Sequence, residues 1–97
     1  MNTSNKHVNY IQLIEKKWTV SIILSLFDSS KRFCDISKSI PNVTEAMISK
    51  RLRELESSEL VDRRVFTEGK LRIEYSLTEK GKAIHSVITR LQSLDFY

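Results

Sequence analysis

Apolar residues recur at helical spacing over most of the chain and alternate over one stretch near its middle. Val8, Ile11 and Ile14 follow helical spacing, which predicts a short helix over residues 7–15. In residues 16–28, the most hydrophobic segment, four polar side chains share one narrow sector of a helical wheel: Lys17, Ser21, Ser25 and Asp28. A helix that is apolar around most of its girth lies inside a domain, so we expect this helix to be central and Trp18 to be a core residue.

Two further helices with a turn between them are predicted next. Residues 34–40 read as a short amphipathic helix, which Pro41 ends because the residue before a proline disfavours helical geometry. After the turn, Thr44 is a good N-cap for a helix over residues 45–57. This helix is expected to bury Ile48, Leu52 and Leu55 and to present Ala46, Ser49, Lys50 and Arg53 on its opposite side.

The alternating stretch predicts a β-hairpin, with strands over residues 60–66 and 70–77. A three-residue loop, 67–69, with Gly69 in the left-handed conformation pairs odd positions with odd positions. The odd positions Val61, Val65, Leu71, Ile73 and Tyr75 then share one apolar face.

The same register predicts a cluster of cations on the outer face of the hairpin. Arg64 and Arg72 lie directly opposite each other, with Lys70 beside them. Like charges that face each other across a ladder are destabilising, which favours a phosphate between them. The alternative is neutralisation by the nearby carboxylates of Asp62, Glu68 and Glu74.

The chain closes with a helix over about residues 79–94, capped by Thr78 and striped with apolar residues from Ile84 to Leu94. Residues 1–6 are polar and expected to be disordered. Two helices joined by a four-residue turn and followed by a hairpin make a winged helix-turn-helix. We therefore predict one domain over residues 1–97, mainly α with a small antiparallel hairpin.

Composition narrows the classes of function. The 97 residues carry 16 Lys and Arg against 12 Asp and Glu, a net charge of +4 that favours a polyanionic partner. One Cys and two Gly exclude a disulfide framework, a cysteine-cluster zinc site and a glycine-rich phosphate loop. No apolar run exceeds three residues and the N-terminus has no apolar signal core, so we expect a cytoplasmic protein without a membrane segment.

Catalytic chemistry finds no support in the sequence. His7, His85 and Cys34 fall in separate elements, and no metal-ligand spacing or nucleophile motif is present. We therefore expect no enzyme activity, no metal and no cofactor. His85 is expected at the surface or in an interface, and Cys34 as a small buried residue, with a reactive thiol as the alternative.

Five segments in order carry a resemblance to a known family. They are Lys17-Trp18-Thr19, the KRFCDI run 31–36, the MISKRLRELE run 47–56, the LVDR run 60–63 and the EYSLTEKG run 74–81. Together they resemble the HxlR-type winged helix-turn-helix transcriptional regulators, relatives of the MarR regulators. The resemblance covers roughly residues 8–94.

This resemblance implies a homodimer bound to double-stranded DNA with a pseudo-palindromic operator. The helix 45–57 would enter the major groove, where Arg and Lys can donate to guanine, and the wing 64–72 would meet the backbone or minor groove. The candidate DNA-binding residues are Thr44, Ala46, Ser49, Lys50 and Arg53 on the helix, Arg64, Lys70 and Arg72 in the wing, and Lys31 and Arg32 before it. The alternative is a winged-helix module that binds another protein and no nucleic acid.

Dimerisation is expected through the terminal helices, residues 7–15 and 79–97. The candidate interface residues are Val8, Ile11, Ile14, Leu91, Leu94, Phe96 and Tyr97, since little chain remains to cover them. The alternative is packing of the two termini against each other within one chain. The sequence points to no particular small-molecule effector.

Departures from the family pattern qualify what the resemblance implies. Glu59 stands where the family usually has Gly after the recognition helix, and a positive φ at a non-glycine residue costs on the order of 1 kcal/mol, which favours a turn built differently. The wing is short and lacks proline. The redox-sensing branch has a Cys near the N-terminus where this chain has about Asn5, so we do not expect that thiol switch.

Overall fold

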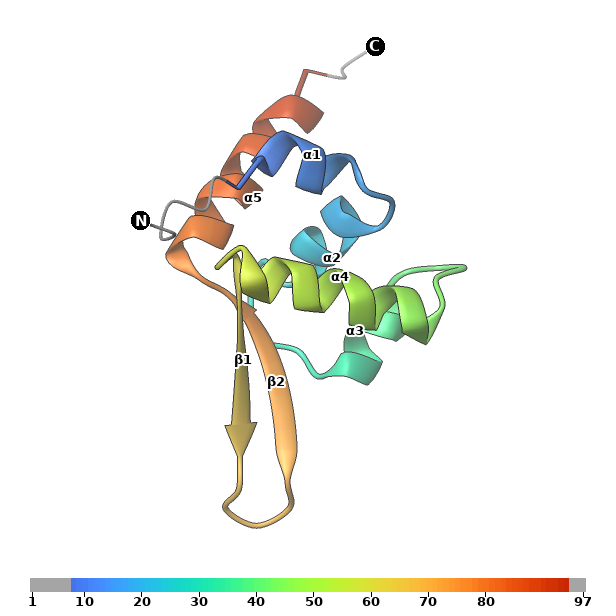
Figure 1. The fold of residues 1–97 in the computed structure, drawn as a ribbon, viewed down its shortest axis with the longest axis vertical. Coiled ribbons are helices and arrows are strands. Elements are labelled where there is room, and N and C mark those ends of the chain that lie inside the picture. Colours follow the sequence, from blue (N-terminus) through green and yellow to red (C-terminus); the bar gives the residue numbers. More distant parts are fainter. Residues whose placement is uncertain (1–7, 95–97) are drawn as a thin grey trace, which may run out of the picture.

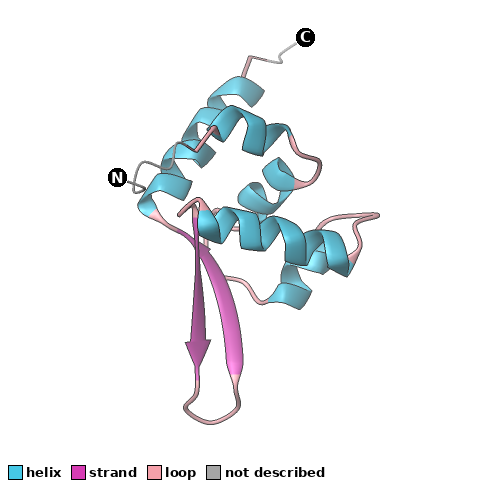
Figure 2. Ribbon diagram, viewed as in Figure 1, coloured by secondary structure: helices cyan, strands magenta, loops and turns pink. Residues whose placement is uncertain are grey.

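The computed structural model describes residues 8–94, which form a helical body and one projecting hairpin (Figures 1 and 2). In chain order the elements are α1 (Tyr10–Glu15), α2 (Thr19–Ser25), α3 (Phe33–Ser39), α4 (Glu45–Ser57), β1 (Val61–Phe66), β2 (Arg72–Leu77) and α5 (Glu79–Gln92). The hairpin extends from one end of the molecule, while α1 and the C-terminal half of α5 lie at the other (Figure 1). The predicted winged helix-turn-helix is confirmed. The expectations for residues 1–6, His7, Phe96 and Tyr97 lie outside the described residues.

Helix α2 is the centre of the helical body, as its apolar girth predicts. It packs against α1, α3, α4 and α5, and Ile22 and Ile23 are completely buried. The predicted span 16–28 is too long. The helix begins at Thr19 because Trp18 has φ +80°, a left-handed conformation that interrupts the helical path from α1. The Trp18 side chain is half-buried and packs against the core.

Helix α4 spans the predicted residues and begins at the predicted cap. The Thr44 hydroxyl accepts a hydrogen bond from the Met47 N–H at 3.2 Å, which satisfies one of the free donors of the first turn. The predicted face of Ile48, Leu52 and Leu55 is buried. Because that face is fixed against the core, the rotation of the helix is fixed, and so is the face that it presents to solvent.

The end of α4 retains the turn that a glycine would favour, although Glu59 occupies the position. Glu59 has φ +64°, and the Glu59 and Leu60 N–H groups donate to the carbonyls of Glu56 and Leu55, both at 2.9 Å. These two bonds are the Schellman pattern of a helix C-terminus. The expectation of a differently built turn is therefore wrong. Burial of Leu55 and Leu60 at the two ends of the motif stabilises it despite the left-handed residue.

The segment from Leu77 to Gly81 joins the wing to α5 and contacts the turn after α4. The Thr78 hydroxyl accepts from the Gly81 N–H at 3.0 Å and donates to the Glu59 carbonyl at 2.7 Å, so it caps α5 and holds the α4–β1 turn. A Cβ at Gly81 would overlap the Leu60 carbonyl oxygen. Glycine here permits the close approach of α5 to that turn.

The hairpin has the predicted parity but a different register. Val65 pairs with Ile73 and Phe66 with Arg72, so the loop spans residues 67–71 rather than 67–69. Gly69 adopts the predicted positive φ, at +76°. Leu71, expected in the apolar face of the sheet, lies in the loop and is exposed. A shift of two residues keeps every remaining side chain on its face, so the alternation of the sequence cannot distinguish the two registers.

Two residues have the opposite burial from that expected. Cys34 is exposed, because it follows Phe33 on α3 and lies outside the face that Phe33 and Ile36 bury. His85 is only 8% exposed and stacks on the Phe27 ring, with ring centres 4.4 Å apart. It lies on the same side of α5 as Gly81 and Ile88, which are also buried.

Candidate DNA-binding surface

The outward side of α4 carries the residues that the sequence singled out. Ala46, Lys50 and Arg53 are exposed and Ser49 is half-buried, while the opposite side of the helix is fixed in the core. Thr44 is exposed at the N-terminus, where the free N–H groups and the helix dipole favour an anion. This face can offer charged donors to base edges and small side chains that allow close approach.

The segment before α3 is joined to the wing by backbone hydrogen bonds. The Lys31 N–H donates to the Tyr75 carbonyl at 2.9 Å, and the Tyr75 N–H donates to the Lys31 carbonyl at 2.8 Å. Lys31 and Arg32 therefore sit against β2, at the start of the helix-turn-helix. The structure brings this segment and the wing into one surface region.

Arg72 does not face Arg64, so the predicted repulsion between them is absent. Arg64 lies opposite Glu74 in the ladder. The Arg72 Nε donates to Glu74 Oε2 at 2.8 Å, and its guanidinium lies 4.3 Å from the centre of the Phe66 ring. The Ser30 hydroxyl donates to the other Glu74 oxygen at 2.7 Å. The hydrogen bond from Ser30, together with that from Arg72, lowers the pKa of the Glu74 carboxyl. The charged Glu74 carboxylate therefore links the wing residue Arg72 to Ser30 in the helical body.

The candidate cations divide into two groups by their partners. Lys31 is held by Asp28 at 3.2 Å, and Arg72 by Glu74. Within residues 8–94, the side chains of Arg32, Lys50, Arg53, Arg64 and Lys70 form no ion pair with a carboxylate. All five are exposed. Their charge is therefore available to an external anion.

The terminal helices and the residues beside them expose large apolar side chains. Ile11 on α1 is 65% exposed, Leu91 near the end of α5 is 58% exposed, and Leu94, just after α5, is 66% exposed. Val87 on α5 is also largely exposed. Of the other described candidates for the dimer interface, Val8 and Ile14 are half-buried, and Ile14 packs against the core of its own chain.

Sequence reasoning missed Arg51, the buried cation of α4. Only 8% of it is exposed, and its guanidinium donates to the Lys17 carbonyl and to Glu54. The signal was present, since Arg51 lies three residues after Ile48 and next to Leu52, on the core side of the helix.

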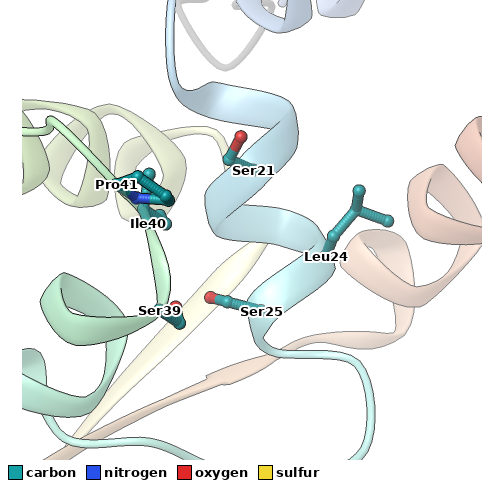
Figure 3. Close-up of a pocket in the computed structure, with 6 residues that line it drawn as sticks. All are labelled: Ser21, Leu24, Ser25, Ser39, Ile40 and Pro41. Atoms are coloured by element: carbon teal, nitrogen blue, oxygen red, sulfur yellow. The ribbon is translucent and has the colours of Figure 1, made fainter.

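A cavity beside the helix-turn-helix is lined by small polar side chains. A cavity of about 320 Å³ lies between α2 and the end of α3, with Ser21 and Ser25 directed toward Ser39 and Pro41 (Figure 3). The Ser25 and Ser39 hydroxyls donate to carbonyls of their own helices, at 2.7 and 2.8 Å.

In the described part of the chain no three His, Cys, Asp or Glu side chains are grouped to hold a metal ion. None of the helices within residues 8–94 is long and apolar enough to cross a membrane.

Comparison with known proteins finds that this chain is similar to helix-turn-helix transcriptional regulators. A family model described as an HxlR-like helix-turn-helix matches residues 13–95. The HTH-type transcriptional regulator YodB of Bacillus subtilis is 41% identical over 81 residues, which are 84% of this chain and 72% of YodB. The structure of reduced YodB has a TM-score of 0.81 at 39% identity and covers 87% of this chain and 82% of that one. A MarR-family regulator from Enterococcus faecalis V583 has a TM-score of 0.82 at 28% identity, with 97% of this chain and 90% of that one covered.

Proposed function

This chain belongs to the HxlR-like helix-turn-helix family and is a DNA-binding transcriptional regulator, and from that premise we propose that it binds a pseudo-palindromic operator as a homodimer. The proposal assigns the DNA to the surface formed by α4, the segment at residues 31–32 and the wing. It involves no enzymatic step and no cofactor. As a regulator of transcription, the protein acts in the cytoplasm.

Helix α4 reads bases in the major groove in this proposal. Lys50 and Arg53 donate to guanine O6 and N7, Ser49 contacts a base or a phosphate, and Ala46 leaves room for close approach. Thr44 and the N-terminal N–H groups hold a backbone phosphate. The support is that Lys50 and Arg53 are exposed and have no carboxylate partner among the described residues.

The wing and the residues before α3 bind the phosphate backbone, and the wing also reaches the edge of the minor groove. Arg64, Lys70 and Arg32 supply the charge in this proposal. Lys31 and Arg72 act mainly through the ion pairs that orient the loop and the hairpin, since their charges are already compensated by Asp28 and Glu74. Phosphate contacts of this kind fix the position of the protein and carry little sequence information.

The homodimer forms through α1 and α5 in this proposal. Ile11, Leu91 and Leu94 are large apolar side chains left in water, and a partner chain would remove them from it. Helix α1 and the C-terminal half of α5 lie at the end of the molecule opposite the wing (Figure 1), so a two-fold dimer can present two copies of α4 to one duplex. Half-sites are then expected one helical turn apart, roughly 34–36 Å, or a multiple of this.

The observation that carries the proposal is the exposed, uncompensated cationic side of α4. Selection of the full chain on a pool of random duplex DNA tests it, followed by hydroxyl-radical footprinting on the enriched sequence. We expect an enriched pseudo-palindrome with two protected half-sites. Binding without enrichment would contradict sequence-specific recognition, and no binding at low salt would contradict the proposal and favour a protein-interaction module.

A further inference from the structure

Arg51 belongs to the proposed reading helix but is directed away from its reading face. Its Nε donates to the Lys17 carbonyl at 2.9 Å, and its terminal nitrogen donates to Glu54 Oε1 at 3.0 Å. A nearly buried guanidinium without partners would be strongly unfavourable, so these contacts are needed to keep Arg51 in the interior. The hydrogen-bond donors of Arg51 thus contact the protein itself and are not directed toward DNA.

Glu54 extends this contact to the end of α1. Its second carboxylate oxygen accepts from the Lys16 ammonium at 3.1 Å, so one carboxylate joins two cations from different elements. Burial on its own raises the pKa of Glu54, but the hydrogen bond from Lys16 and the charges of Arg51 and Lys16 outweigh it and lower the pKa. The carboxylate is therefore charged at neutral pH and completes a chain of Lys16, Glu54 and Arg51.

The turn that receives these contacts has an unusual backbone. Trp18 follows Lys17 with φ +80°, a conformation that costs a non-glycine residue on the order of 1–2 kcal/mol. Such conformations persist only where surrounding contacts hold them. The Lys17 carbonyl is held by Arg51, and the Lys17 ammonium lies 4.8 Å from the centre of the Trp18 ring. The turn is therefore held by Arg51 from α4 and by a local contact between its own two residues.

The contact joins two surfaces with different proposed roles. The turn follows directly from α1, which carries the exposed Ile11 of the proposed dimer interface, and Arg51 lies in α4 between Lys50 and Arg53. We propose that Arg51 is a positioning residue that fixes the reading helix relative to the dimerisation helix, and so sets the separation of the two reading helices in the dimer. This inference rests on the proposed function. Arginine suits the role because its rigid planar fork offers donors in two directions, which a lysine cannot reproduce.

The test compares binding of Arg51→Met and wild type to four duplexes: the selected full site, one isolated half-site, and two full sites with one base pair added or removed between the halves. We expect Arg51→Met to bind the full site about 10-fold more weakly, because the two reading helices are no longer held at the spacing of the site before binding. Half-site affinity and salt slope should stay unchanged, because Arg51 contacts no DNA. The preference for the native spacing should also weaken.

Controls separate positioning from folding. Arg51→Lys keeps the charge and is expected to resemble Arg51→Met. Glu54→Gln keeps the hydrogen bond from Arg51 to the Lys17 carbonyl and should lose less affinity for the full site than Arg51→Met. This variant provides the test if Arg51→Met does not fold. Glu56→Gln is the matched control, because it makes the same charge change on the same helix. Glu56 forms no ion pair among the described residues, so this variant should bind like wild type.

Two results would overturn the inference. The first is an equal loss of affinity for the half-site and the full site in Arg51→Met, or in Glu54→Gln if Arg51→Met does not fold. An equal loss would mean that the residue contacts DNA or only stabilises the fold. The second is wild-type discrimination of spacing by the folded variants. If the wild-type protein shows no preference for two half-sites, the proposed dimeric function itself fails, and this inference fails with it.

Discussion

Arg64 and Arg72 lie in the same hairpin, yet removing each charge should affect DNA binding differently. Arg72 is compensated by Glu74 at 2.8 Å, whereas Arg64 is exposed and has no carboxylate partner within residues 8–94. One phosphate contact changes the logarithm of the affinity by about 0.9 per decade of salt concentration. Raising the salt from about 50 to about 200 mM should therefore weaken wild type about 3.5-fold more than Arg64→Ala, which has lost one contact. Arg72→Ala should keep the wild-type slope.

Fluorescence anisotropy with a labelled duplex, repeated over a series of salt concentrations, measures these slopes. Arg90→Ala serves as a control, since it removes an exposed cation from the last turn of α5, and the C-terminal half of that helix lies at the end of the molecule away from the wing (Figure 1). The reasoning is refuted if Arg72→Ala reduces the slope as much as Arg64→Ala does, because the ion pair with Glu74 would then not compensate Arg72.

Three further predictions concern stability and assembly. Because Glu59 has φ +64°, the variant Glu59→Gly should be more stable than Glu59→Ala by about 1 kcal/mol, or roughly 4–8 °C in Tm. At Ser58, with φ −86°, the alanine variant should instead be more stable than the glycine variant. The same order of stability at both positions would contradict this reasoning. The pKa of Glu54 is lowered on folding, so its stabilisation exists above the ordinary value of 4.5 and disappears as the pH falls through the folded pKa. Urea titrations of Glu54→Gln should therefore show a deficit near pH 7 that shrinks below about pH 4.5, and a constant deficit would contradict the assignment. Leu91→Glu should shift the sedimentation mass from dimer to monomer at micromolar concentration, and an unchanged mass would exclude α5 from the interface.

The helices were predictable because their apolar faces and caps are local properties of the sequence. Thr44 and Thr78 each cap a helix where expected, and α4 has the predicted bounds. The register of the hairpin was not predictable in this way. Alternation fixes which face a residue occupies, while the choice between registers two residues apart depends on contacts such as Ser30 with Glu74, 44 residues away in the chain.

Burial of single polar residues also depends on tertiary contacts. His85 lies on the core side of α5 and is covered by Phe27, a residue of the segment that follows α2. Arg51 lies on the core side of α4 and is tolerated there because the Lys17 carbonyl and Glu54 satisfy its donors. The residue type of each favours the surface, whereas its position on the helix favours the interior. Position decided the outcome in both cases, because long-range partners were available.

The most direct test of the central claim measures which base pairs lose their preference when the outward side of α4 is changed. Binding of Lys50→Ala and Arg53→Ala is compared with wild type on the selected site and on the same site with each base pair substituted in turn. Direct readout predicts that each variant loses about 1–3 kcal/mol on the native site and loses discrimination at one or two base pairs only. Equal weakening on every sequence would show that these side chains contact only phosphates, and α4 would not be the element that reads the sequence.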